Sequence, residues 1–112
     1  MELIPHNPTE GVYATGGDWL HAMEVRGAER LLFVSGTMGL DPGGTPGRTL
    51  EEQLEMVWNN IRAILASAAM TTDNIVRLTS YLRDASYAAA NAAPRLRALG
   101  PRPIPTTAIV AQ

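Results

Sequence analysis

Residues Leu31–Pro42 read LLFVSGTMGLDP, and this stretch decides which fold the sequence predicts. It opens with four consecutive apolar residues, which have the length and composition of a strand buried on both faces. Gly36 follows, where the missing side chain permits a sharp bend or a close approach by a ligand. We therefore predict a core strand ending in a Ser35-Gly36 turn, where main-chain amides can hold a small ligand. A plain core strand running into a bend is the simpler interpretation.

The composition predicts one globular domain over residues 1–112. Hydrophobic residues make up 46% of the chain and charged residues 18%, as in ordinary folded domains. The chain has no cysteine, which excludes disulfides, a thiol nucleophile and cysteine-ligated zinc. The amino terminus lacks the basic-then-apolar pattern of a signal peptide, and no apolar run approaches membrane-spanning length. We expect a cytoplasmic protein without a membrane partner.

Charge is distributed unevenly along the chain. Residues 1–55 carry nine acidic and three basic side chains, whereas residues 56–112 carry two acidic and six basic ones, and every basic residue is arginine. The formal net charge of −2 makes nucleic acid an unexpected partner. Arginine suits carboxylate recognition and interface ion pairs, although each arginine taken singly is most simply a surface residue.

Before the opening stretch, the chain predicts an irregular start and one strand. Residues 1–19 contain two prolines and three glycines, which favour irregular structure. Residues 20–26 alternate loosely between apolar and polar side chains, and a short connection separates them from residues 31–37. These two segments are therefore expected to pair as a hairpin.

After the opening stretch, the pattern alternates between helix and strand. Thr49–Glu52 matches a capping box, and apolar residues at helical spacing predict a helix over 50–69. Period-two alternation predicts a strand over 75–83, an alanine-rich helix follows over 87–99, and a β-branched strand ends the chain over 106–111. The strand over 31–37, the helix over 50–69 and the strand over 75–83 in succession predict a crossover unit and an α/β sandwich.

Standard catalytic motifs are absent from the sequence. The glycine-rich run over 43–49 lacks the lysine and the glycine spacing of a phosphate-binding loop. His6 and His21 are the only histidines, and neither belongs to a metal-ligand cluster. We therefore predict no metal site.

Several segments in their order and spacing resemble the YjgF/RidA family, whose members are also labelled L-PSP endoribonucleases or translation inhibitors. The family implies a chorismate-mutase-like (bacillary type) α+β fold, a two-layer sandwich with a mixed β-sheet covered on one face by two helices. It also implies a homotrimer with a ligand cleft at each subunit interface. The segments are Phe33–Gly36, Leu40–Pro42, Gln53, Asn60, Asp73–Thr79, Asn91 and Pro103–Thr107.

The resemblance further implies hydrolysis of imines or enamines, with no cofactor. The Ser35-Gly36 pair matches the family's ligand-binding turn, and Asn91 matches its helix asparagine. Trp19 stands where a tyrosine is expected. Pro105, followed by Thr106 and Thr107, stands where the family has a carboxylate-binding arginine, and the final family strand with its glutamate has no counterpart here. Ligand contacts are thus expected from Trp19, Ser35, Gly36, Asn91, Pro105 and Thr107.

Two functions remain open at this point. One is an enzyme acting on small imines or related carbonyl compounds, and the other is a non-catalytic trimer that binds a small metabolite or a partner protein. Pro105 has no donor to clamp a carboxylate, so activity on 2-imino acids is expected to be weak or absent, unless Arg102 substitutes. The ribonuclease label fits poorly with an acidic chain lacking a basic stripe.

Overall fold

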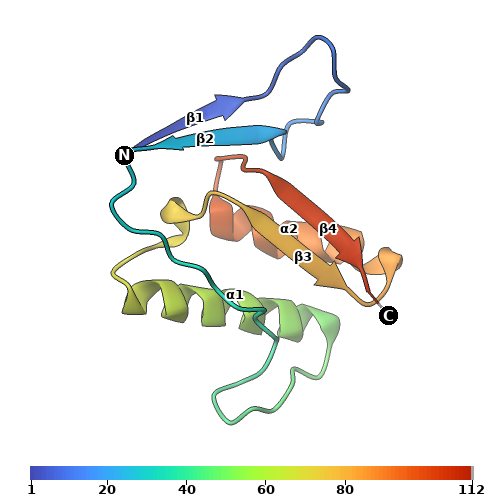
Figure 1. The fold of residues 1–112 in the computed structure, drawn as a ribbon. Coiled ribbons are helices and arrows are strands. Elements are labelled where there is room, and N and C mark those ends of the chain that lie inside the picture. The colour runs from blue at the N-terminus through green and yellow to red at the C-terminus, as the bar shows by residue number, and fades with distance from the viewer. Residues whose placement is uncertain (112) are drawn as a thin grey trace.

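A computed structural model describes residues 1–111 and shows an α+β protein with four strands and two helices in that part of the chain (Figure 1). Two single-turn 3-10 helices, η1 and η2, precede β3 and α2. In chain order the elements are β1 (Glu2–His6), β2 (Ala22–Arg26), α1 (Leu50–Ser67), η1 (Thr72–Asn74), β3 (Leu78–Leu82), η2 (Ala85–Tyr87), α2 (Ala88–Leu99) and β4 (Thr106–Val110).

Helix α1 begins at the predicted cap. The amide of Glu52 donates to the Thr49 hydroxyl at 3.1 Å, and the Glu52 carboxylate accepts from the amide of Arg48 at 2.8 Å. The first bond satisfies an amide of the first helical turn that has no intrahelical partner, and the second fixes the chain just before the cap. At the other end, the guanidinium of Arg30 donates to the Ala68 carbonyl at 2.7 Å, so a cation meets the negative end of the helix dipole.

Strand β3, helix α2 and strand β4 form a parallel crossover unit. β3 and β4 pair in parallel, with Leu78 opposite Thr106 and Leu82 opposite Val110. Before α2, the Asp84 carboxylate accepts the amide of Ser86, and this hydrogen bond lowers the pKa of Asp84. The predicted strand over 75–83 and helix over 87–99 are confirmed with slightly narrower bounds.

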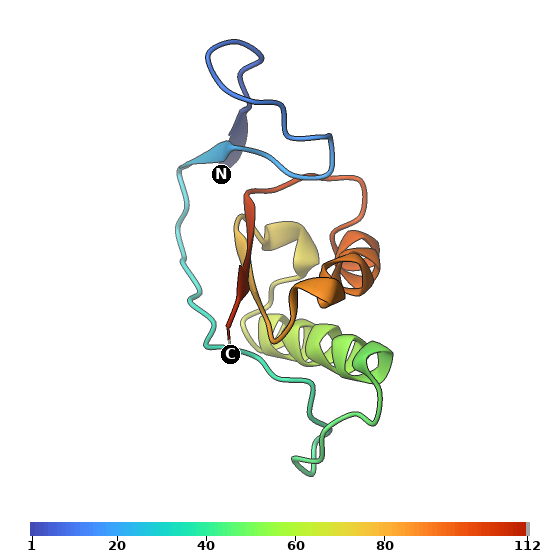
Figure 2. The same ribbon diagram turned by 90° about the vertical axis from the view of Figure 1, so that its right-hand side faces the viewer.

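The two helices lie on the same side of the β3–β4 pair (Figure 2). Between these layers, buried side chains of α1, α2 and the segment before β4 form one cluster, against which Met23 of β2 packs. The fold is thus the expected two-layer, chorismate-mutase-like arrangement, although its strands form two separate pairs in the described residues. The cluster consists of Trp58, Ala98, Leu99 and Ile104, with Met23, Ile61, Ile75 and Leu78 packed against it.

The amino-terminal pairing differs from the prediction. Residues 2–6 were expected to be irregular, but they form β1 and pair antiparallel with β2. The predicted hairpin between 20–26 and 31–37 is therefore wrong. Cross-strand polar contacts favour the observed pair, because Glu24 of β2 binds His6 of β1 at 2.8 Å. Pro5 is tolerated in β1 because this strand is at an edge.

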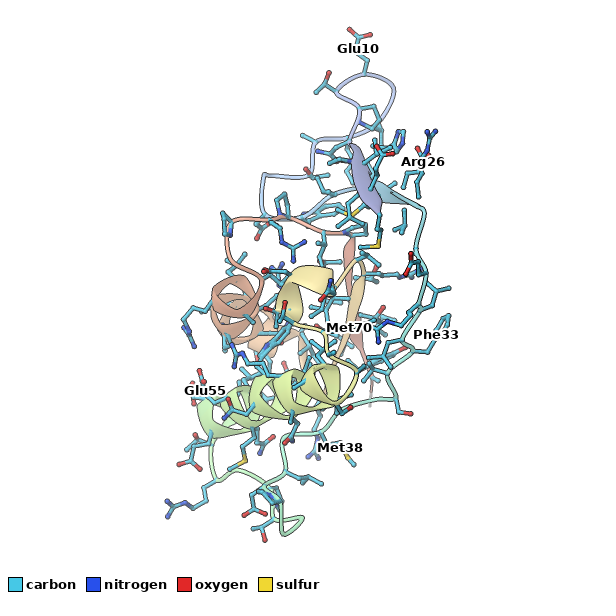
Figure 3. All side chains as sticks on the ribbon, turned by 90° about the vertical axis from the view of Figure 1, so that its left-hand side faces the viewer. Glu10, Arg26, Phe33, Met38, Glu55 and Met70 are labelled. Atoms are coloured by element: carbon cyan, nitrogen blue, oxygen red, sulfur yellow. The ribbon has the colours of Figure 1, made fainter. Side chains whose placement is uncertain are left out.

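Residues 31–38, which we call the extended segment, are not a buried strand. Leu31 is 72% exposed and Phe33 is 88% exposed, and Figure 3 shows Phe33 on the side of the molecule away from α2. No strand is assigned here. An apolar run of this kind needs covering elements on both faces, and the described chain supplies neither. The prediction of a core strand is thus wrong for the single chain, and so is the predicted crossover from that strand through the first helix to the strand over 75–83.

Candidate functional site

The candidate site lies where the amino-terminal loop crosses the start of β4. The amide of Leu20 donates to the carbonyl of Ile104 at 3.2 Å, and Leu20 forms an isolated parallel bridge with Pro105. Leu20 is 7% exposed and Ile104 is fully buried. Apolar burial therefore anchors both segments, the amino-terminal loop and the start of β4. This contact brings Trp19, the neighbour of Leu20, to the start of β4.

Helix α2 contributes a buried arginine to the same place. Arg95 donates from Nη1 to the Asp18 carbonyl and from Nη2 to the Asp18 carboxylate, both at 3.4 Å. Only 10% of the Arg95 side chain is exposed, against 48% for Asp18. Asn91 precedes Arg95 by four residues and therefore lies on the same helix face. We call Asp18, Trp19, Asn91, Arg95 and Pro105 the loop–helix site.

An aromatic cluster borders this site on the loop. The ring of His21 meets Trp19 edge-on at a centroid distance of 5.3 Å and Tyr13 at 4.9 Å. Nε2 of His21 contacts the Tyr13 carbonyl at 2.7 Å. A carbonyl can only accept, so Nε2 carries the hydrogen and, in the neutral ring, Nδ1 keeps the lone pair. Asn7 holds the loop by accepting the amide of His21 at 2.9 Å.

The structure brings together some of the predicted site residues and separates others. Trp19 and Pro105 lie where the loop meets the start of β4, Asn91 lies one turn before Arg95 on α2, and Thr107 lies on the same side of β4 as Pro105. Ser35 lies in the extended segment, where its carbonyl accepts the Thr37 hydroxyl at 3.2 Å. No contact within residues 1–111 joins it to the loop–helix site.

The sequence predicts that Gly36 is required for a sharp bend or a close approach, and the structure does not support this within the single chain. A Cβ atom built at this glycine meets nothing within 4 Å, and its φ lies outside the left-handed region. Within the single chain, neither a tight turn nor a close approach therefore requires glycine here. Its suggested ligand contact stays a prediction.

Arg102 is held away from the loop–helix site by other partners. Its Nη2 donates to the Thr72 carbonyl of η1 at 2.9 Å, and its Nε lies 3.9 Å from the Asp73 carboxylate. The side chain lines a surface hollow of about 520 Å³ together with Leu3 and Leu99. The geometry thus gives no support to Arg102 as the substitute clamp.

Sequence reasoning missed the residues that give this site its charge. Arg95 was treated as one of several surface arginines, and Asp18 was not considered. The available signal was the spacing of Asn91 and Arg95, which places an arginine one turn from the asparagine already singled out.

Within residues 1–111, no cluster of three or more histidine, aspartate or glutamate side chains could hold a metal ion. No helix in that range is long and apolar enough to cross a bilayer.

Comparison of the sequence and the fold with known proteins identifies the family of this chain. Residues 12–111 match the family described as Endoribonuclease L-PSP. The RutC family protein YjgH of Escherichia coli is 41% identical over 48% of this chain and 41% of its own length. A RutC family protein of Aquifex aeolicus is 37% identical over 61% of this chain and 53% of its own. The matches thus span about half the length of these curated relatives.

A solved structure extends the likeness to the whole chain. The crystal structure of the Rid-family protein YyfB from Yersinia pestis, described as a protein of unknown function, is 25% identical and superposes with a TM-score of 0.79. The similarity covers all of this chain and 89% of that one. Profile, relatives and fold agree, and the chain belongs to the Endoribonuclease L-PSP family, which is the YjgF/RidA family.

Proposed function

We propose that this chain forms a homotrimer that hydrolyses imines or enamines of small carbonyl metabolites at the loop–helix site. The observation that carries the proposal is the position of Trp19, Asn91 and Pro105. Each was expected in the ligand pocket from the family resemblance alone. The Leu20–Pro105 bridge brings the loop of Trp19 to the start of β4, and Arg95, one turn after Asn91, binds Asp18 next to Trp19. A buried cation bound to Asp18, the residue that precedes an aromatic side chain, suits a small polar ligand with an unsaturated group.

The proposed reaction adds water across the C=N bond and releases ammonia, leaving a ketone or aldehyde. It changes no oxidation state, so positioning of the imine and water provides much of the rate. Trp19 would form one wall of the site. His21 lies beside Trp19, and its Nδ1 lone pair could accept a proton from the attacking water.

Assembly into trimers is supported by the apolar surface left uncovered by one chain. The extended segment exposes Leu31 and Phe33, and the β3–β4 pair exposes Tyr81, Ile109 and Val110. Contiguous apolar surface of this kind marks interaction sites. Sedimentation equilibrium at micromolar concentration should give the mass of three chains, and a monomer would contradict this part of the proposal.

The reaction can be tested by generating imines in solution. A dehydratase or an amino-acid oxidase supplies 2-imino acids, and an amine oxidase supplies imines that lack a carboxylate. We expect the wild-type protein to accelerate the decay of the uncharged imines and to act weakly on 2-imino acids, because Pro105 offers no donor. If no imine decays faster although a carbonyl compound binds, the protein is a binding module and not an enzyme.

A further inference from the structure

We propose that Arg95 is the group that binds an anionic ligand in the loop–helix site, and that Asp18 is its displaceable internal partner. The inference rests on the proposed function for the location of the site. It adds a residue that would determine specificity: a carboxylate on the ligand would take the place of the Asp18 carboxylate on the guanidinium.

The first argument is the imbalance between burial and pairing at Arg95. Its charged side chain is only 10% exposed, and a buried charge is costly unless it is closely paired. Charge-assisted N–H···O bonds are normally about 2.7–2.9 Å long, yet both contacts to Asp18 are 3.4 Å. One of them reaches a main-chain carbonyl, so the carboxylate is not bound in the two-pronged manner that arginine favours.

The same helix offers a comparison. Arg97 lies on the surface and binds the Glu55 carboxylate at 2.7 Å, with 62% and 56% of the two side chains exposed. The exposed arginine, which needs a partner least, therefore has the closer one. The buried Arg95 retains unused capacity for a better-placed carboxylate.

The second argument is the position of Asp18 in the loop. Thr15 and Leu20 are buried at 8% and 7% exposure and anchor the chain on both sides of Asp18. Between them, Gly16 and Gly17 adopt φ values of +81° and +98°, and nothing lies within 4 Å of a Cβ built at either. Glycine there can change its backbone angles at little steric cost. Asp18 could thus turn away without displacing either anchor.

This arrangement also explains the expected weakness toward 2-imino acids in terms of competition. An internal carboxylate competes with the ligand at high effective concentration. The apparent affinity for the ligand is the intrinsic affinity multiplied by the fraction of chains in which the guanidinium is free. The Asp18→Asn substitution keeps the size of the side chain but removes its charge, so the ligand carboxylate should bind more tightly.

The test measures binding of 2-oxobutanoate, a stable analogue of an imino acid, by titration calorimetry. Its uncharged amide is titrated in parallel. Asp18→Asn should tighten binding of 2-oxobutanoate about tenfold or more and leave the amide unchanged. Arg95→Gln should abolish the difference between the two compounds. Arg97→Gln is the matched control from the same helix and should leave both affinities unchanged.

Two results would overturn the inference. One is an Asp18→Asn protein that binds 2-oxobutanoate no better than the wild type, and the other is an Arg95→Gln protein that still prefers the acid to its amide. If circular dichroism shows that Arg95→Gln does not fold, Arg95→Lys takes its place. Arg95→Lys should show a weaker preference for the acid over its amide, and an unchanged preference would contradict the inference. Imine turnover is measured separately. If Asp18→Asn binds 2-oxobutanoate more tightly but no imine is turned over, this inference is supported and the proposed reaction is contradicted. If imines are turned over but binding is unchanged in both variants, the proposed reaction is supported and this inference is contradicted.

Discussion

The two halves of the chain bury their apolar residues to very different extents. Of the eight buried hydrophobic residues within 1–111, seven lie between Leu54 and Ile104, in the part of the chain that holds α1, β3 and α2, and Leu20 alone lies before residue 50. The extended segment, in contrast, exposes four consecutive apolar side chains, of which Phe33 is labelled in Figure 3. Because apolar burial is the main source of folding free energy, the carboxyl-terminal half should stabilise the single chain. The amino-terminal half should gain most from contact with another chain.

The largest effect is expected in the carboxyl-terminal core. Trp58 is 4% exposed at the centre of the buried cluster, so Trp58→Ala should lower the free energy of unfolding by about 3–5 kcal/mol. Urea denaturation followed by circular dichroism measures this change. Ile64→Ala, on the same helix at 37% exposure, is the control and should cost less than half as much. Equal costs for the two substitutions would contradict the contrast drawn between buried and exposed positions.

The next effect concerns assembly through the extended segment. Phe33→Asp places a carboxylate where the proposed neighbouring chain would cover an apolar ring. An unpaired buried charge should weaken association by about 3 kcal/mol, or roughly a hundredfold in dissociation constant. Sedimentation equilibrium should show a shift from trimer toward monomer. Phe33→Leu keeps the site apolar and should remain trimeric, and a Phe33→Asp protein that assembles like the wild type would locate the interface elsewhere.

A smaller loss of stability is expected at the start of α1, which belongs to the well-buried carboxyl-terminal half. Thr49→Ala removes the hydroxyl that accepts the amide of Glu52 and should cost about 1 kcal/mol of stability. Thr49→Ser retains the acceptor and should be nearly neutral. Thermal or urea unfolding of both variants measures the difference. A neutral Thr49→Ala would mean that the Glu52 contact to Arg48 alone maintains this helix end.

The smallest effect is the pH response of the β1–β2 pair. The hydrogen bond from His6, followed by that from Arg26, holds the pKa of Glu24 below its usual value. The stabilisation is therefore present above the pKa of an unfolded glutamate, about 4.3. It is lost as the pH falls through the lowered pKa of the folded state. A carboxyl-carbon NMR titration should show the lowered midpoint, and His6→Gln should move it back toward the ordinary value; a midpoint unaffected by that substitution would contradict the assignment.

The same contrast explains what could be predicted from the sequence. Helix α1 was predicted closely because its cap and its apolar spacing are local properties of residues 49–69. The elements β3, α2 and β4 were also predicted from local patterns, although their parallel crossover was not. The pairing of β1 with β2 was missed because it joins residues separated by a long loop, and no local pattern selects that partner.

At the candidate site, the family resemblance indicated Trp19, Asn91 and Pro105. The spacing from Asn91 could have placed Arg95 on the same helix face, but its burial could not be predicted, because the burial depends on the position of Asp18, 77 residues away. The apolar run at Leu31 was expected to be buried by its own chain. An apolar pattern indicates that burial is favourable but not which surface provides it.

The extended segment also has a consequence for hydrogen exchange. Among residues 1–111, no amide of residues 31–37 donates a hydrogen bond to another group, whereas the amides of α1 beyond its first turn are bonded within the helix. In an isolated chain, these seven amides should exchange with deuterium at close to the rate of an unstructured peptide. Any protection they acquire must come from a second molecule. Their exchange rates would thus report, residue by residue, the fraction of time that this part of the chain spends covered.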